Sequence, residues 1–538
     1  MRNGFIASSI LVMGVLATSA FGCGDSGTDP EAPVLPPEGP LVVDTDKGKV
    51  EGWLLEKTRQ FLGIPFAAPP IGDLRWKRPQ PHAAWTETFV ADTKGKMCTQ
   101  GKAIGTGIET TSGEDCLTIN VWTPERPTSD KLPVMVWIYG GGFEIGSGSD
   151  NMYDGRILSE QTGAVVVTFN YRLGPLGFLA LPALAAEDKD HSSSGAYGLE
   201  DQRAALEWVK TNIASFSGDP TKVTLFGESA GGISTCAHIV SPPSKGLFQR
   251  AIIESGPCDS SISKADGEAQ GAKYVEALGC TAAPDVLACL RGKTEEEALF
   301  ALPSDGDFLF GNGANWYPVI DGYNLPDRQG KLLESGAFEK MPIIVGTNAD
   351  EGSLFFALDN IQVPDEATFL SLIEKVVPGK SAEILAHYPI ATYGDPKTAL
   401  STAVGDAGFI CQTRRMARAF LKGGATPYLY HFTYAPPDSL LGPIGSFHAA
   451  EVKYVFGVPS LLSPQALNDD ELTMSAAIQG YWSRFAAAGD PNGANAVAWP
   501  KYDAASDENI KIDVTISKDA NLRKELCDWW DTIEVTIP

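Results

Sequence analysis

Short apolar runs rich in β-branched residues recur along the chain, with longer helical patterns between them. The clearest runs are residues 134–139, 164–171, 223–226, 251–253, 342–345 and 428–432. Near-continuous apolar runs are typical of strands that are buried on both faces, and such strands belong to parallel sheets covered by helices. Helical patterns at residues 199–213 and 230–239 separate some of these runs. The alternation predicts an α/β fold with a mostly parallel central sheet, flanking helices and large insertions.

The length of 538 residues would by itself allow roughly three to four domains of about 150 residues. From Leu41 onward, however, no linker rich in Pro, Gly or Ser interrupts the pattern, and the sequence contains no internal repeat. We therefore expect residues 41–538 to form one large α/β domain.

The N-terminus has the layout of a secretory signal. Arg2 precedes an uncharged stretch with an apolar centre at residues 5–17, and small residues follow. A membrane anchor is the alternative, but the apolar centre is short and is interrupted by Gly and Ser. We expect residues 1–22 to be a signal peptide and no later segment to span a bilayer.

The end of this signal can be interpreted in two ways. The tripeptide Ala20-Phe21-Gly22 fits a signal peptidase site, and with Cys23 it also resembles a bacterial lipoprotein box, although Leu is more usual where Ala20 stands. Residues 23–40 are rich in Pro, Gly and Asp, which predicts an extended tether. A tether directly after a cysteine favours lipidation of Cys23. We expect an exported protein that is secreted, periplasmic or lipid-anchored at the cell envelope.

Composition narrows the possible partners. The 43% hydrophobic content is too high for a disordered chain, and a net charge of −25 is unfavourable for binding nucleic acid, whose phosphates require Lys and Arg. Without Cys23, eight of the nine cysteines remain. An even number in an exported chain predicts disulfides, but their pairing does not follow from the number alone.

A candidate nucleophile lies in the segment 227–231, which has the pattern G-x-S-x-G. The pattern stands between an apolar run and a helical stretch, as in the sharp strand-to-helix turn that exposes a nucleophilic serine. Such a turn would also place the hydroxyl of Ser229 at a helix N-terminus, which favours developing negative charge. The alternative is a glycine-rich turn with a bystander serine.

A second glycine-rich segment, Gly140-Gly141-Gly142, follows the run at 134–139. Three glycines lose much conformational entropy on folding, but they let backbone N–H groups approach a ligand without obstruction. In hydrolases of this architecture such a loop supplies oxyanion donors, together with the N–H that follows the nucleophile, here Ala230. An ordinary flexible loop is the alternative.

The base and the acid should follow Ser229 in the order acid, then histidine. This order excludes three of the six histidines; His387 lies in a helical pattern and His431 in an alternating strand, whereas His448 follows a Gly/Pro loop. The acid should lie just beyond the run 342–345, where Asp350 and Glu351 are adjacent. Either carboxylate could orient an imidazole, so the pattern leaves both open. No metal-ligand cluster appears, and such a triad requires no cofactor.

Nine segments resemble the type-B carboxylesterase/lipase family, which includes the cholinesterases. They are FLGIPFAAPPIGDLRW (61–76), EDCLTINVWTP (114–124), WIYGGGF (137–143), NYRLGPLGFL (170–179), YGLEDQ (197–202), GESAGG (227–232), PVIDG (318–322), GTNADEG (346–352) and HAAEVKYVFG (448–457). The resemblance runs from about residue 50 to the C-terminus. It implies an α/β-hydrolase fold and hydrolysis of a small-molecule ester, here by an exported bacterial member.

Carried over position by position, the resemblance implies roles for individual residues. The implied catalytic triad is Ser229, Glu351 and His448, which favours Glu351 over its neighbour. The implied oxyanion donors are Gly141, Gly142 and Ala230. Three further residues match a buried polar shell around the triad histidine: Glu228, Ser255 and Glu451.

The resemblance also implies disulfides. The implied pairs are Cys98–Cys116, Cys280–Cys289 and Cys411–Cys527. The two cysteines that remain are Cys236 and Cys258, and we expect them to pair with each other.

Departures from the family pattern bear on the substrate. The segment between Cys98 and Cys116 contains no Trp, and Leu354 stands at the aligned choline-site aromatic, although Phe355 follows. Without an aromatic cage there is little cation–π attraction for a quaternary ammonium, so we expect no true cholinesterase activity. The leading hypothesis is a serine carboxylesterase for neutral esters. The alternatives are a lipase for longer-chain acyl glycerides and a non-catalytic adhesion protein like the neuroligins, which would lack a nucleophile or base that this chain has.

Overall fold

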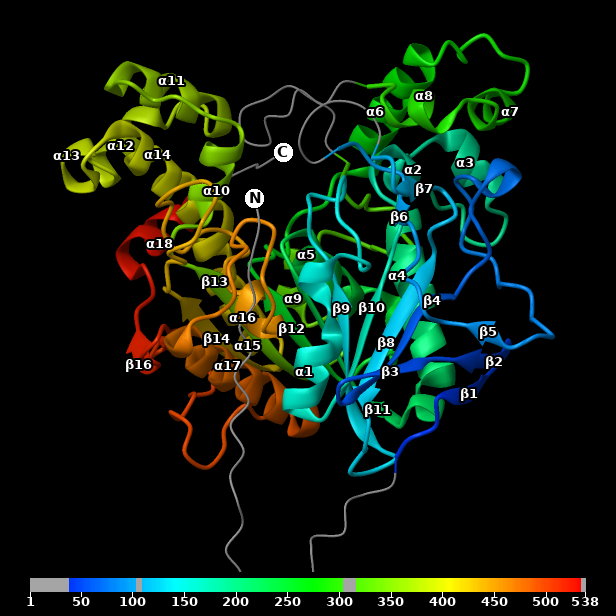
Figure 1. The fold of residues 1–538 in the computed structure, drawn as a ribbon. Helices are drawn as coiled ribbons and strands as arrows, with labels where there is room; N and C mark the ends of the chain where they lie inside the picture. The colour runs from blue at the N-terminus through cyan, green and yellow to red at the C-terminus, as the bar shows by residue number, and fades with distance from the viewer. Residues whose placement is uncertain (1–37, 103–108, 303–315, 534–538) are drawn as a thin grey trace, which may run out of the picture. The chain divides into compact units, whose positions relative to one another are not determined.

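A single eleven-stranded sheet organises the computed structural model, which describes residues 38–102, 109–302 and 316–533 (Figure 1). In sheet order the strands are β16 (Ser517–Ala520), β15 (Glu508–Ile512), β14 (Thr426–Phe432), β13 (Pro342–Asn348), β12 (Arg250–Glu254), β11 (Gly218–Glu228), β9 (Leu132–Ile138), β10 (Val165–Phe169), β8 (Thr118–Pro124), β4 (Thr58–Pro65) and β3 (Trp53–Leu55). The strands from β15 to β10 run parallel, and antiparallel strands complete both ends. The predicted α/β fold with a mostly parallel sheet is confirmed.

Each of the six predicted apolar runs overlaps one of the parallel strands β9 to β14. These strands are almost wholly buried, as in β10, because helices cover both of their faces. The pattern did not predict β4, because its first residues are polar although they are buried. Arg59 is an example, since its guanidinium donates to the carbonyl oxygens of Pro40 and Pro124 inside the fold.

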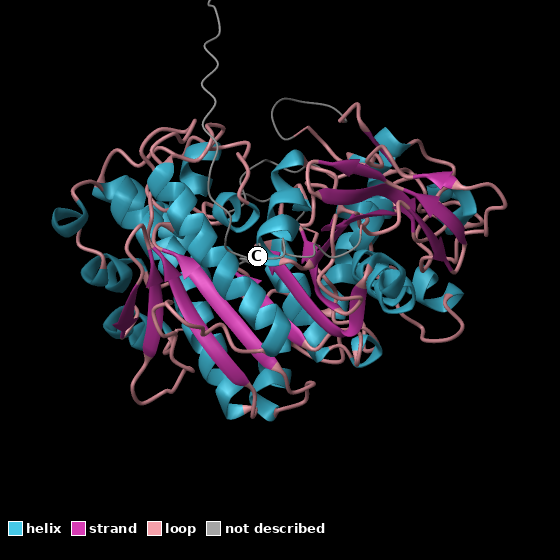
Figure 2. Cartoon of the chain, turned by 60° about the horizontal axis from the view of Figure 1, so that its bottom comes forward, coloured by secondary structure: helices cyan, strands magenta, loops and turns pink. Residues whose placement is uncertain are grey.

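Helices cover both faces of the sheet, as Figure 2 shows. One layer consists of helices that contact one another in series: α4 (Tyr197–Asn212), α5 (Ala230–Val240), α9 (Gln329–Ser335) and α15 (Cys411–Lys422). The other consists of α1 (Gly155–Thr162), α16 (Val452–Phe456) and α17 (Asp469–Ala488). The predicted helical patterns correspond to α4 and α5. Helix α5 packs on β11 and β12 at the centre of the sheet.

Long insertions follow β12 and β13 and lie at the upper right and upper left of Figure 1. The first contains α6 (Lys264–Ala277), α7 (Val286–Arg291) and α8 (Glu295–Leu299). The second contains α10 (Glu351–Leu358), α11 (Glu366–Val376), α12 (Ser381–His387), α13 (Ile390–Tyr393), α14 (Pro396–Gly405) and a π-helical segment, η5 (Asp406–Ile410). The remaining elements are β1 (Val42–Thr45), β2 (Gly48–Glu51), β5 (Phe89–Val90), β6 (Met97–Cys98), β7 (Ser112–Gly113), α2 (Gly174–Phe178), α3 (Pro182–Glu187), α18 (Lys524–Trp530) and four short 3-10 turns, η1 (Gly72–Leu74), η2 (Asn151–Tyr153), η3 (Ile213–Phe216) and η4 (Pro242–Ser244).

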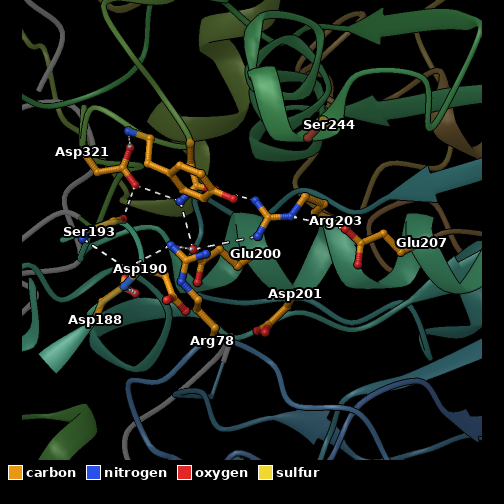
Figure 3. A network of polar contacts seen from close by, with 12 residues as sticks. Arg78, Asp188, Asp190, Ser193, Glu200, Asp201, Arg203, Glu207, Ser244 and Asp321 are labelled. Carbon is orange, nitrogen blue, oxygen red and sulfur yellow. Dashed lines mark hydrogen bonds and ion pairs between the residues drawn. The ribbon is translucent and has the colours of Figure 1, made fainter.

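A polar network joins several of the matched motifs away from the glycine-rich loops (Figure 3). Arg78 contacts Glu200 of α4 at 3.2 Å and Asp188 at 3.0 Å, and Ser193 donates a hydrogen bond to Asp321. Buried carboxylates such as those of Glu200 and Asp321 are stable only when they are paired and hydrogen-bonded. The network therefore gives the motifs around Glu200 and Asp321 a structural role.

Four disulfides join the eight cysteines that the sequence analysis paired. They are Cys98–Cys116, Cys236–Cys258, Cys280–Cys289 and Cys411–Cys527. The Cα–Cα distances of 4.9–5.8 Å lie within the usual range. Disulfides in this number are typical of proteins that fold outside the reducing cytosol.

The expected signal peptide and Cys23 lie outside the described residues. Within the described ranges, no helix combines the length and the apolar composition that crossing a membrane requires.

Candidate active site

Five neighbouring strands converge on one site at their carboxyl ends. In sheet order β14, β13, β12, β11 and β9 are adjacent and parallel, so their carboxyl ends lie along one edge of the sheet. The predicted site residues follow these ends: Gly141 after β9, Ser229 after β11, Ser255 after β12, Glu351 after β13 and His448 after β14. Residues that are more than 300 positions apart in the chain are thereby brought together.

Ser229 occupies a strained turn between β11 and α5. Its backbone has φ 54° and ψ −124°, a conformation that non-glycine residues rarely adopt, and its N–H donates to the carbonyl oxygen of Glu254 at 2.9 Å. The flanking glycines are needed because the turn packs closely. A Cβ atom on Gly231 would lie 1.9 Å from the carbonyl oxygen of Ile138, and one on Gly227 would lie 2.6 Å from the same atom.

The imidazole of His448 is held by Glu351. Nδ1 of His448 lies 2.6 Å from Oε2 of Glu351, and both side chains are buried. The other carboxylate oxygen accepts three hydrogen bonds, from the hydroxyls of Ser255 and Thr347 at 2.6 Å and from the backbone N–H of Asn348 at 2.7 Å. A carboxylate fixed in this way orients the imidazole and sets its tautomer.

Asp350, the neighbouring carboxylate, turns away from the imidazole. Its Oδ2 accepts a hydrogen bond from the backbone N–H of Ser446 at 2.9 Å. Asp350 thus anchors the loop that leads to His448, whereas Glu351 contacts the ring. The sequence pattern left open which of the two carboxylates orients the imidazole. At the start of α10, Glu351 points towards His448 and Asp350 points towards Ser446.

Nε2, the second ring nitrogen of His448, faces the nucleophile turn. Oε1 of Glu228 lies 3.1 Å from it, but no group within the described residues forms a hydrogen bond of good geometry with this nitrogen. Glu451 lies further back, where its carboxylate accepts a hydrogen bond from Nδ2 of Asn348 at 2.6 Å. Of the three residues of the predicted polar shell, Glu228 thus faces the imidazole, whereas Ser255 contacts Glu351 and Glu451 contacts Asn348.

The buried charges change the proton affinities in the site. Burial lowers the pKa of His448, but the negative charges of Glu228 and Glu351 outweigh it and raise this pKa to about 9. Burial raises the pKa of Glu351, but His448 and the hydrogen-bond donors around it lower this pKa below its usual value. Burial raises the pKa values of Glu228 and Glu451. Among these carboxylates, Glu351 is thus the one that most strongly favours the ionised form.

The site opens into a cavity of about 740 Å³. Its lining includes the three glycines of the loop after β9, together with Ser229, Ala230, Glu228 and His448. The volume is in the range of small-molecule binding sites. The candidate nucleophile, base and oxyanion donors therefore share one space that an ester could enter.

An aromatic pair packs against His448, and the sequence analysis did not predict it. The ring centroids of Phe355 and Phe409 lie 5.1 and 4.7 Å from the imidazole, and the two phenyl rings stack at 5.6 Å. Phe355 belongs to α10, whereas Phe409 projects from the π-helical segment η5. No local pattern marks Phe409, because a π-helical turn has no distinctive sequence signature and brings the ring to the site only through the tertiary fold.

Two hydrogen-bonding residues of the site were also missed. Thr347 and Asn348 lie in a matched motif, but only the structure reveals that they bind the carboxylate of Glu351. Elsewhere, His387 stacks on Trp529 at 4.0 Å, and His431 lies within β14. In the described ranges, no three or more His, Cys, Asp or Glu side chains gather in a way that could hold a metal ion.

The central nucleophile turn, the glycine loop and the acid–histidine contact at the carboxyl edge of a mixed sheet define an α/β-hydrolase. A sequence model of the carboxylesterase family matches residues 39–530. The acetylcholinesterase of Bungarus fasciatus is 33% identical over 537 residues, which cover 92% of this chain and 86% of that protein. The chain belongs to the carboxylesterase family and is a carboxylic ester hydrolase.

Proposed function

We propose that this protein is a serine carboxylesterase that hydrolyses neutral carboxylic esters, with Ser229, His448 and Glu351 as its catalytic triad. The observation that carries the proposal is the 2.6 Å contact between His448 and Glu351 beside the strained turn of Ser229, on one cavity. The presence of both a nucleophile and a base argues against a non-catalytic adhesion role.

The proposed reaction has two steps. His448 accepts the proton of the Ser229 hydroxyl as its oxygen attacks the ester carbonyl, and the tetrahedral intermediate breaks down when the imidazolium gives this proton to the leaving alkoxide. In the second step His448 accepts a proton from water as the water oxygen attacks the acyl carbon, and the imidazolium then returns this proton to the Ser229 oxygen as the acyl–oxygen bond breaks and the acid leaves. Glu351 remains ionised and stabilises the imidazolium.

The backbone N–H groups of Gly141, Gly142 and Ala230 would stabilise the oxyanion. Gly141 and Gly142 have φ values of 112° and 61°, which are favourable only for glycine, and Ala230 begins α5. A helix N-terminus and preorganised N–H donors stabilise negative charge that develops in the transition state. Glu228, Ser255 and Glu451 would act indirectly, by setting the charge and orientation of the triad.

The lining of the cavity supports an uncharged substrate. The lining contains six acidic residues, Glu109, Asp150, Glu228, Asp259, Asp266 and Asp359, and one arginine, Arg328, which pairs with Asp259 at 2.6 Å. These charges, with a net charge of −25 on the chain, repel anionic esters. Leu354 also lines the cavity where an aromatic cage for a quaternary ammonium would need a ring, so we propose no true cholinesterase activity.

We also propose that residues 1–22 are a signal peptide and that the protein is held at the cell envelope by a lipid on Cys23. The sequence layout and the four disulfides support export. Residues 23–40 would then separate the domain from the membrane surface as a tether.

Substitution of Ser229 tests the proposed reaction. Ser229→Ala should lower kcat for p-nitrophenyl acetate by about 10⁴-fold or more, because a triad without its nucleophile retains only the effects of binding and the oxyanion hole. Ser335→Ala, an exposed serine at the end of α9, is the matched control and should retain full activity. A fluorophosphonate probe should label the wild type and the control, but not Ser229→Ala. Unchanged turnover in Ser229→Ala would refute the assignment.

A further inference from the structure

An apolar stripe on α10 leads from the site to solvent. Leu354 and Phe355 lie three to four positions before Leu358, so the three side chains share one face of the helix. All three line the cavity. Leu354 is 6% exposed, whereas Leu358 is 51% exposed, which places Leu358 at the opening. The stripe therefore extends over about one helical turn, or about 5.4 Å, from the interior to the surface.

A second exposed leucine also lines the cavity. Leu461 is 61% exposed and also belongs to the lining. The segment that precedes His448 connects the two regions: Ser353 of α10 donates to the carbonyl oxygen of Ile444 at 2.6 Å, and the N–H of Leu440 donates to the carbonyl oxygen of Leu462 at 2.9 Å. In Figure 1 the orange loops beside α16 accordingly lie close to α10. Exposed large apolar side chains gathered at the mouth of a cavity indicate a binding surface.

The chemistry of the triad decides which half of the ester meets this stripe. In acyl transfer the imidazole gives its proton to the oxygen of the leaving alcohol, so the alcohol half must lie beside His448. Phe355, which begins the exposed part of the stripe, packs against the imidazole at 5.1 Å. The side chains that contact the imidazole, such as Phe355, therefore line the part of the cavity that holds the alcohol half of the ester.

We infer that Leu358 and Leu461 form an outer subsite for the alkyl chain of the substrate's alcohol, so that the preferred esters combine a longer, apolar alcohol with a shorter acid. The inference rests on the proposed serine esterase mechanism. The chain of the alcohol would leave the imidazole between Phe355 and Leu354, run along α10 and cover Leu358 and Leu461. Each methylene that leaves water in this path favours binding.

Two isomeric esters separate the alcohol side from the acyl side. Octyl butanoate and butyl octanoate have the same atoms and differ only in which half carries the long chain. Below their solubility limits, the wild type should hydrolyse octyl butanoate with the higher kcat/KM. Leu358→Ser and Leu461→Ser should each lower the ratio of kcat/KM for octyl butanoate to that for butyl octanoate about five-fold, because they remove apolar contact from the alcohol side only.

Leu472→Ser is the matched control. Leu472 is 53% exposed on α17 and does not belong to the cavity lining, so this substitution should leave the ratio unchanged. All three leucines are exposed, and their replacement by serine should not impair folding. Equal thermal midpoints of the three variants will verify this.

Three results would overturn the inference. One is a ratio that Leu358→Ser and Leu461→Ser leave unchanged. Another is a larger effect of these variants on butyl octanoate, which would assign the stripe to the acyl half. The third is a rate that rises sharply only above the solubility limit, which would assign the leucines to contact with a lipid–water interface. In each case, retained hydrolysis of p-nitrophenyl acetate shows that the esterase proposal stands. Loss of all ester hydrolysis by the wild type would refute both.

Discussion

At the scale of single residues, the site combines strain with buried charge. Four non-glycine residues around it have positive φ: Phe143, Ser229, Ser255 and Ala449. Such conformations each cost about 1–3 kcal/mol and persist only where the surrounding fold enforces them. Each of the four lies directly after a strand or beside a residue of the predicted triad or its glycine loop. The fold thus accepts a cost in free energy at the positions where it must hold the reacting groups in a fixed geometry.

The contact between Glu228 and His448 should control the pH dependence of activity. The base must be neutral to accept a proton, so kcat/KM rises as the pH rises through the pKa of His448. Burial lowers this pKa, but Glu228 and Glu351 raise it to about 9, above the ordinary value of a histidine. Glu228→Gln removes one of these negative charges and should therefore shift the acid limb of the kcat/KM profile to lower pH, by about one unit or more.

Glu254→Gln is the matched control for this experiment. Burial raises the pKa of Glu254 as it does that of Glu228, but Glu254 is not among the charges that raise the pKa of His448, so an amide at this position should leave that pKa unchanged. In the wild type, Trp482 Nε1 donates a hydrogen bond of 2.9 Å to Glu254, and the amide oxygen of the variant can still accept it. The acid limb of this variant should coincide with that of the wild type. An equal shift in both variants, or no shift in Glu228→Gln, would contradict the electrostatic explanation.

At the scale of elements, the strands were predictable where their burial matched their composition. The strands β9 to β14 are apolar because both faces are covered, and each contains one of the predicted runs. Strand β4 was missed because buried polar side chains such as Arg59 and Gln60 obtain their stability from partners distant in sequence, which no local pattern contains. The π-helical segment that carries Phe409 was missed because only the tertiary fold brings this ring to the site.

The disulfides offer a test at this scale. In the chain-entropy description, the stabilisation by a crosslink increases with the logarithm of the number of residues in the loop that it closes. The loops of Cys411–Cys527, Cys236–Cys258 and Cys280–Cys289 span 116, 22 and 9 residues. Replacing each pair by two alanines should destabilise the fold by roughly 5, 3 and 2.5 kcal/mol. At one scan rate, the decrease in thermal midpoint should be largest for the variant without Cys411–Cys527 and smallest for the variant without Cys280–Cys289.

A different order would have a clear meaning. If the double variant of Cys236 and Cys258 lost the most stability, native-state packing between α5 and the segment after β12 would outweigh loop closure. Alkylation without reduction, followed by intact-mass measurement, is the control for the wild type. It should detect no free thiol among the eight paired cysteines.

At the scale of the whole molecule, the composition is consistent with an exported enzyme. A net charge of −25 favours solubility and opposes binding to polyanions. The described residues form one unit, in which the five strand ends meet. The length alone had allowed several domains. The continuous motif order predicts one domain instead, and the strands of the described eleven-stranded sheet come from positions between 53 and 520.

The proposed anchor can be tested on the full chain. In a bacterial host that matures lipoproteins, the wild type should incorporate radiolabelled palmitate and partition into the detergent phase of a Triton X-114 extract. Cys23→Ser should incorporate no label and partition into the aqueous phase, because the lipidated thiol is absent. Ser26→Ala, three residues further on, should behave as the wild type. An unlabelled wild-type protein in the aqueous phase would indicate simple cleavage of the signal peptide.

By itself the sequence determined the class of the fold and the positions of its motifs. Apolar strands, glycine turns and chain order are local properties, and they follow from burial and backbone sterics that each segment carries with it. The tertiary structure alone decided which atoms meet. It directed Glu351 to His448 and Asp350 to Ser446, brought Glu228 to within 3.1 Å of Nε2, and laid an apolar path from the imidazole to Leu358. These contacts join segments about 100 or more residues apart, or depend on the direction in which a helix begins, and neither is encoded in a local pattern.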